Sequence, residues 1–86
     1  MKHDKQERKK YTDAMIKKLH PKNQRYYLLD SECIGLRIYV QITGEKSFYL
    51  QRYISEYKYS KRTKIGDFPE MSITQARKLG AMIKAD

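Results

Sequence analysis

Apolar and polar residues alternate in the middle of the chain with the two-residue period of β-strands. From Leu36 to Ile42 every second residue is aliphatic, and the residues between them are polar or aromatic. The same alternation runs from Phe48 to Ile54, where only Arg52 falls on the apolar side. A third, more polar run extends from Tyr59 to Gly66, and Thr43 to Glu45 separate the first two runs. The pattern predicts three antiparallel strands, the first two joined as a hairpin.

Two other segments have helical spacing. Thr12 is a suitable N-cap for a short helix that ends at His20, because Pro21 follows. Ser72 to Gln75 match a capping box at the start of a second helix. The apolar face of that helix, which has small residues for close packing, consists of Ile73, Ala76, Leu79, Gly80 and Ile83. We therefore predict an α+β fold in which a three-stranded antiparallel sheet packs on a C-terminal helix, with a short N-terminal helix. Tyr26 to Asp30 are a candidate for a further short strand at the sheet edge.

One helix covers only one face of such a sheet, so the other face stays uncovered. The two-residue period places cationic, amide and tyrosine side chains of all three strands together on that uncovered face. They are Arg37, Tyr39, Gln41, Tyr49, Gln51, Tyr53, Arg62 and Lys64. Arginine and lysine neutralise phosphates, and arginine and glutamine pair with guanine and adenine edges in the major groove. The uncovered face is therefore a candidate surface for binding nucleic acid.

The charge balance indicates the same kind of partner. Nineteen Lys and Arg against ten Asp and Glu give a net charge of +9, which is typical of proteins that bind a polyanion. In residues 1–10 no apolar residue follows Met1, and we expect this segment to be a disordered basic arm before a single domain over residues 11–86. The arm contains five basic and two acidic residues, so a net charge of +6 belongs to the domain.

The composition argues against several other classes of protein. A length of 86 residues allows one small domain. No apolar run is long enough for a membrane span or a secretory signal, so we expect a cytoplasmic protein without a membrane partner. Cys33 is the only cysteine, and His3 and His20 do not complete a zinc site with it. Without paired carboxylates, a glycine-rich phosphate loop or a nucleophile with its base, we expect neither an enzyme nor a metal or cofactor.

The residues alone leave several partners open for the uncovered face. Three strands span roughly 10 Å, and the major groove of B-DNA is about 12 Å wide, so double-stranded DNA is compatible with the sheet. A single-stranded nucleic acid could instead stack its bases on Tyr39, Tyr49 and Tyr53. A protein partner is a further alternative, as is a plain solvent face stabilised by cross-strand tyrosine pairs. Arg62 and Lys64 also suit an edge strand that is protected against aggregation.

Five blocks of sequence, in this order, resemble a known family. The blocks are Tyr11-Thr12-Asp13, Asp30 to Leu36, Thr43 to Phe48, Ile65 to Glu70 and Ser72 to Arg77. Together they resemble the N-terminal arm-type DNA-binding domain of phage and genomic-island integrases, the tyrosine recombinases. The resemblance implies a sheet that enters the major groove of arm-type sites and serves DNA integration and recombination, as in a prophage. It also implies double-stranded DNA, other integrase subunits and a directionality factor as partners.

The resemblance implies roles for particular residues. The DNA contacts that it implies are Arg37, Tyr39, Gln41, Lys46, Tyr49, Gln51, Tyr53, Arg62 and Lys64. Lys46 would contact a phosphate from the turn between the first two strands, although a solvated turn lysine is an equal alternative. The sequence lacks the catalytic domain of the recombinases, so no tyrosine here receives the role of their nucleophile. Ser55 to Lys58 depart from the family pattern, because this stretch is longer than usual and lacks glycine, which leaves the register of the third strand open.

Overall fold

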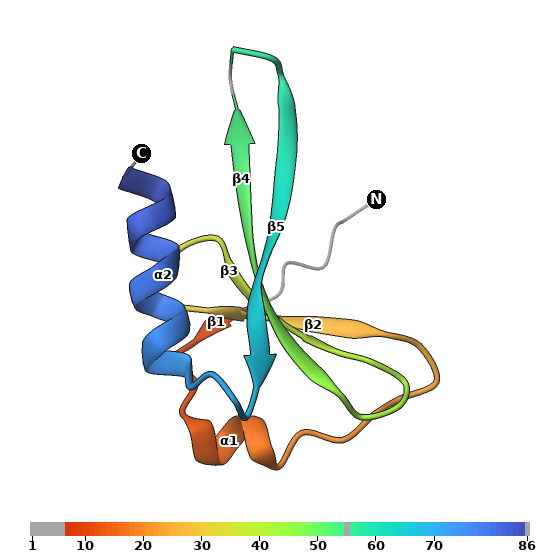
Figure 1. Ribbon diagram of the computed structural model, residues 1–86. Coiled ribbons are helices and arrows are strands. Elements are labelled where there is room, and N and C mark those ends of the chain that lie inside the picture. The colour runs from red at the N-terminus through yellow and green to blue at the C-terminus, as the bar shows by residue number, and fades with distance from the viewer. Residues whose placement is uncertain (1–6, 55, 86) are drawn as a thin grey trace.

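The predicted strands and helices form a sheet with two helices on one side. The computed structural model describes residues 7–54 and 56–85. The strands are β1 (Arg8–Lys9), β2 (Tyr26–Asp30), β3 (Leu36–Val40), β4 (Lys46–Ile54) and β5 (Tyr59–Phe68), and the helices are α1 (Asp13–Lys17) and α2 (Ile73–Ala85). The five strands form one sheet in the order β1-β2-β3-β4-β5. Figure 1 shows α2 along one side of the sheet and α1 below it.

The α+β class and both helices are confirmed, but the predicted number of strands is wrong. Tyr26–Asp30, the candidate edge strand, pairs antiparallel with β3. Arg8 and Lys9, which we expected in a disordered arm, pair in parallel with Leu29 and Asp30. Both side chains of β1 are exposed, so its pairing depends on backbone bonds and leaves no hydrophobic pattern in the sequence. The sheet is therefore five-stranded and mixed. Residues 1–6 of the expected arm lie outside the described residues.

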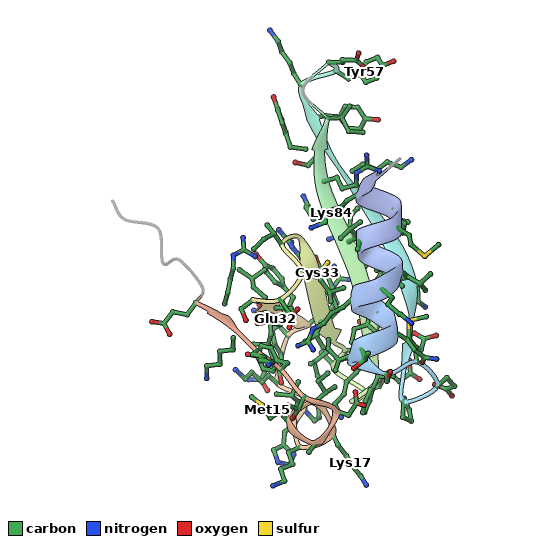
Figure 2. The ribbon with its side chains drawn as sticks, turned by 90° about the vertical axis from the view of Figure 1, so that its left-hand side faces the viewer. Met15, Lys17, Glu32, Cys33, Tyr57 and Lys84 are labelled. Carbon is green, nitrogen blue, oxygen red and sulfur yellow. The ribbon has the colours of Figure 1, made fainter. Side chains whose placement is uncertain are left out.

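The core lies between the sheet and the two helices. The fully buried aliphatic and aromatic side chains of this layer include Ile16, Leu36, Ile38, Phe48 and Leu50. The predicted close approach of α2 is confirmed: a Cβ built on Gly80 would lie 3.0 Å from Cys33 Sγ. Figure 2 shows Cys33 on the sheet side of α2. One face of the sheet is thus occupied by the core, and the other is not.

Both predicted helix caps are present. The Thr12 hydroxyl accepts a hydrogen bond from the Met15 N–H over 3.2 Å, so α1 begins where the sequence indicated. The Gln75 N–H donates to Ser72 Oγ over 3.1 Å, and Gln75 Oε1 accepts from the Ser72 N–H over 3.0 Å. This reciprocal pair is a capping box. α1 ends at Lys17, earlier than the predicted His20.

A buried ion pair fixes α2 to the sheet. The Asp30 side chain is fully buried, and its Oδ1 lies 2.8 Å from Arg77 Nη2. Arg77 Nε also donates to Asp30 Oδ2, and Arg77 Nη2 donates to the Tyr11 carbonyl oxygen over 2.7 Å. The backbone N–H groups of Glu32 and Cys33 donate to the same carboxylate. Asp30 and Arg77 therefore join β2, the loop after it, the segment between β1 and α1, and α2.

The pairing of β4 with β5 defines the register that the sequence left open. Tyr49 pairs with Lys64, and Gln51 pairs with Arg62. The register shifts between Phe48 and Tyr49, because Phe48 pairs with Gly66 and Ile65 is left as a bulge. A Cβ on Gly66 would lie 2.8 Å from Met71 Cε, and a Cβ on Gly80 would lie 4.0 Å from Ile65 Cδ1. Ile65 and Gly66 therefore both lie on the helix side of the sheet. The strand continues beyond the predicted end at Gly66 to Phe68.

Two strand ends differ from the predictions for local reasons. β3 ends at Val40, and Ile42 is 60% exposed in the turn, where it contributes nothing to the predicted apolar face. In the turn between β4 and β5, Lys58 adopts a φ of 55°, the left-handed conformation that a glycine supplies in shorter turns. This conformation closes the long β4–β5 hairpin without a glycine. Figure 1 shows that the hairpin projects past the C-terminal end of α2.

Candidate nucleic-acid interface

The pairing register gathers polar side chains on the face of the sheet opposite the helices. Arg37 pairs with Tyr49, and Tyr49 pairs with Lys64, so one row of side chains crosses three strands. A second row joins Gln51 to Arg62. We call this surface the polar face, and it consists of Tyr27, Arg37, Tyr39, Ser47, Tyr49, Gln51, Tyr53, Ser60, Arg62, Lys64 and Asp67. The structure therefore brings most of the predicted contact residues together.

The two remaining predicted residues, Gln41 and Lys46, lie at the β3–β4 turn. Gln41 follows the end of β3, and its N–H donates to the Glu45 carbonyl oxygen over 2.8 Å. Lys46 is the first residue of β4 rather than a turn residue, and it pairs with Val40 and Phe68 on the core side. Gln41 and Lys46 both line a hollow of about 590 Å³ that they share with residues of the polar face. They therefore border this face instead of lying on it.

Tyr39 occupies the centre of the polar face but is buried. Only 3% of its surface is exposed, so its ring is not available to a stacking base. Its hydroxyl oxygen accepts hydrogen bonds from Arg37 Nη1 over 3.2 Å and from Arg62 Nη1 over 2.8 Å. We predicted a direct DNA contact from Tyr39, but in the structure its hydroxyl instead accepts hydrogen bonds from two arginines.

Aromatic rings support the same arginines from below. The Tyr39 ring contacts the rings of Tyr27 and Tyr49, with centroid distances of 5.3 Å and 4.9 Å. The Arg37 guanidinium lies 4.3 Å from the centroid of Tyr27, and that of Arg62 lies 5.3 Å from Tyr39 and 5.7 Å from Tyr49. Cation–π attraction and the shared hydroxyl restrict both guanidinium groups, so little rotamer entropy remains to be lost on binding.

The sequence interpretation missed Tyr27 and Arg25. Tyr27 pairs with Tyr39 in the β2–β3 ladder, and the Arg25 guanidinium lies 5.0 Å from the centroid of the Tyr39 ring. Assigning Tyr26 to Asp30 firmly to a strand beside Leu36 to Val40 would have placed Tyr27 on this face. No pattern within the sequence pointed to Arg25, which lies in the loop before β2.

The two arginines change the acidity of Tyr39. Burial of the ring disfavours the phenolate and raises the pKa of Tyr39. The hydrogen bonds from Arg37 and Arg62, with their positive charges, together outweigh burial and lower this pKa below its usual value of 10.0. The environment of Tyr39 is therefore strongly positive.

Ser47, Lys64 and Asp67 form a second polar cluster, beside the first. Ser47 Oγ donates to Asp67 Oδ1 over 2.7 Å, and Lys64 Nζ lies 3.1 Å from the same oxygen. Residues three apart in a regular strand point to opposite faces, but the bulge at Ile65 places Lys64 and Asp67 on one face. The sequence interpretation missed Asp67, because a bulge leaves no mark in a two-residue pattern. It also missed Ser47, although Ser47 has the strand parity of Tyr49.

We predict that Asp67 contributes to the acid sensitivity of the fold. Hydrogen bonds from Ser47 and then from Lys64 lower the pKa of Asp67 below its usual value of 3.8. A lowered pKa stabilises the folded state above the unfolded-state pKa, and this stabilisation is lost as the pH falls through the folded-state pKa. Asp67→Asn should therefore reduce the drop in Tm between about pH 5 and pH 2, measured by circular dichroism. Glu70→Gln is the control that should follow the wild type, and an equally steep drop in Asp67→Asn would contradict the prediction.

Two features are absent from the part of the chain that the structure describes. None of the helices there is long and apolar enough to cross a membrane. Within the same ranges, no group of three or more His, Cys, Asp and Glu side chains is arranged to hold a metal ion.

The chain also has a match among known protein families. A family model described as "Arm DNA-binding domain" matches residues 11–86. No curated protein matches the chain. The matched range contains every residue of the polar face and both helices.

Proposed function

Because this chain belongs to the family of arm DNA-binding domains, we propose that it binds double-stranded DNA sequence-specifically at integrase arm sites. The polar face enters the major groove, and binding serves DNA integration and recombination. In this proposal residues 11–86 are the DNA-binding domain, and residues 1–10 precede it. The role of the segment is to bind a site rather than to catalyse strand exchange.

The observation that carries this proposal is the pair of arginines held on Tyr39. Arg37 and Arg62 reach the Tyr39 hydroxyl from different strands, and each uses one Nη1 group for that bond. A guanidinium has five N–H donors, so most of its donors remain for a ligand. Two adjacent N–H groups of one arginine match the O6 and N7 acceptors of guanine. Gln51, opposite Arg62 on β4, adds an amide that suits adenine.

The burial of the rings favours a duplex over a single strand. Stacking requires free ring faces, but Tyr39 is buried, and the Arg62 guanidinium lies over the rings of Tyr39 and Tyr49. Tyr53 is 64% exposed, but one ring is a small platform for a strand of several bases. Arg62 and Lys64 are exposed, so apart from Tyr53 the accessible part of the polar face is mainly cationic rather than aromatic.

The experiment that tests the proposal is selection of bound duplexes from a random pool at about physiological salt, with a single-stranded pool in parallel. Enrichment of a short duplex motif is expected. Enrichment in the single-stranded pool alone would contradict the proposal in favour of base stacking. No retention of either pool would leave a protein partner as the function of the polar face.

We predict a marked salt dependence for binding to the selected duplex. The cations on or bordering the polar face are Arg25, Arg37, Lys46, Arg62 and Lys64. If about five phosphates are contacted, log K should fall with log salt with a slope of about −4.5, because counterions are released. Fluorescence anisotropy across a salt series measures the slope. A flat dependence would exclude a phosphate-contacting interface.

Removing the hydroxyl of Tyr39 should impair recognition without removing any charge. Tyr39→Phe keeps the buried ring but releases Arg37 and Arg62 from their shared acceptor. We expect about a fivefold loss of affinity for the selected duplex, since a hydrogen bond contributes about 1 kcal/mol. Tyr26→Phe is the matched control, because the Tyr26 hydroxyl donates to the His20 carbonyl oxygen away from this face. Equal affinities of the two variants would show that the hydroxyl does not position the arginines.

Membership of the family supports a proposal for the wider setting of this function. We propose that the domain acts in the cytoplasm, beside other integrase subunits and a directionality factor. Co-sedimentation of the domain with such a factor on the selected duplex tests this assembly. If the factor bound the domain only in the absence of DNA, the proposed assembly on the duplex would be contradicted.

A further inference from the structure

The end of the β4–β5 hairpin is a second surface, which shares only Tyr53 and Ser60 with the polar face. We call it the hairpin tip, and it consists of residues 52–54 and 56–61. Its strands are paired from Arg52 and Lys61 outward to Ile54 and Tyr59. Figure 2 shows Tyr57 at the far end of the hairpin, well beyond Lys84 in the last turn of α2. The helix therefore covers the base of the hairpin and not its tip.

Three tyrosines of the tip are exposed to an unusual extent. Tyr53, Tyr57 and Tyr59 have 64%, 70% and 48% of their surface exposed, and the rings of Tyr57 and Tyr59 are 6.1 Å apart. Tyr53 points to the side of the polar face, and Tyr59 pairs with Ile54 on the opposite side. Exposed rings on both sides of the end of one hairpin indicate a binding surface.

The tip also carries cations that have no counterion among residues 7–54 and 56–85. Arg52 and Lys61 are directly opposite each other on β4 and β5, on the face of the hairpin that continues the core side beyond α2, and like charges in this position repel. Neither side chain forms an ion pair within the described parts of the chain. Lys58 adds a third positive charge, and Glu56 is the one acidic residue of the segment. The unpaired charge on the tip is complementary to a polyanion.

We propose that the hairpin tip is a second DNA contact, which binds the sugar–phosphate backbone of the duplex beside the site read by the polar face. This inference rests on the proposed function, because the polar face sets the DNA next to the hairpin. The side chains of lysine and arginine and the hydroxyl group of tyrosine donate hydrogen bonds to phosphate, and such contacts do not depend on base sequence. A two-stranded ribbon is also narrow enough to follow the major groove.

The length of the hairpin sets the distance between the two contacts. Tyr49 lies in the body of the sheet, and Ile54 is five residues further along β4. At about 3.3 Å per residue, this stretch spans about 17 Å. That length corresponds to about five base pairs at 3.4 Å each. The tip projects from one end of the sheet, so the second contact lies on one side of the recognised motif.

The test uses the selected duplex in two lengths, one flush with the motif and one with about ten base pairs added on each side. Arg52→Gln/Lys61→Gln should bind the longer duplex about tenfold more weakly than the wild type, with a log-salt slope less negative by about two. On the flush duplex the variant and the wild type should agree. Lys18→Gln/Lys78→Gln removes the same charge from the end of α1 and from α2, away from the hairpin tip, and should match the wild type on both duplexes.

A hydroxyl-radical footprint provides an independent readout. Wild-type protection should extend about five base pairs beyond the motif on one side, and Arg52→Gln/Lys61→Gln should lose this extension. Removal of a repelling pair should not lower Tm, which confirms that the variant is folded. Unchanged affinity and protection in the variant would overturn the second contact and leave the major-groove proposal intact. Failure of the wild type to bind either duplex would overturn both.

Discussion

Arg77→Met is expected to lower the free energy of unfolding by about 3 to 5 kcal/mol, the cost of removing one partner from a buried ion pair. Arg77 donates two hydrogen bonds to the Asp30 carboxylate and a third to the Tyr11 carbonyl oxygen. Because Asp30 is fully buried, removal of the guanidinium leaves a buried carboxylate without its cation. A domain of this size has roughly 4 to 13 kcal/mol of stability in total, so the variant should lose a large fraction of it. Urea denaturation measures the change.

Two further variants identify the cause of this loss. Lys78→Met makes a similar change at the next residue of α2, which is exposed, and should alter stability by no more than about 0.5 kcal/mol. Adding Asp30→Asn to Arg77→Met removes the buried charge and should recover part of the loss. If Arg77→Met cost no more than Lys78→Met, the ion pair would not be what fastens α2 to the sheet.

The second large effect is expected in DNA binding. Arg62→Gln should reduce affinity for the selected duplex by about 10-fold to 100-fold, the effect of one lost bidentate base contact. Arg62 is exposed and is supported by the hydroxyl of Tyr39 and the ring of Tyr49, so its donors are already aligned before DNA arrives. Affinity for an unrelated duplex should fall only by the smaller amount that one phosphate contact contributes. Anisotropy titrations with both duplexes measure the ratio.

Arg62→Lys separates base reading from charge. Lysine keeps the positive charge but lacks the planar fork that matches guanine in a bidentate manner. If Arg62 reads a base, Arg62→Lys should lose most of the specificity that Arg62→Gln loses. If Arg62→Lys kept full specificity, Arg62 would contact a phosphate rather than a base. If Arg62→Gln lost equal affinity for all duplexes, Arg62 would not read a base.

Local sequence was sufficient for the elements whose signal is local. The alternation from Leu36 onward identified β3 and β4, because one buried face imposes a two-residue period. The capping residues Thr12 and Ser72 marked the helix starts, because their side chains bond to backbone groups only three residues away. β1 escaped prediction, since it buries no side chain and depends on a partner strand distant in the chain.

The candidate site was predictable in part of its membership but not in its internal arrangement. Strand parity placed Arg37, Tyr49 and Arg62 on one face, as the pairing register confirms. Parity does not show which side chain lies beneath the others, and so Tyr39 was expected to be an exposed contact. In the structure four neighbours from three other segments surround its ring, which are Arg25, Tyr27, Tyr49 and Arg62.

The sequence by itself determined the α+β class, the basic character and the strand residues Arg37, Tyr49 and Arg62 of the polar face, because each depends on residue type and short-range spacing. The tertiary structure alone decided that Tyr39 is a buried support for two arginines and that Asp67 joins the polar face through the bulge at Ile65. It also decided that Arg77 reaches Asp30 across the core. These features depend on contacts between residues far apart in the chain, and such contacts exist only once the strands have taken their register.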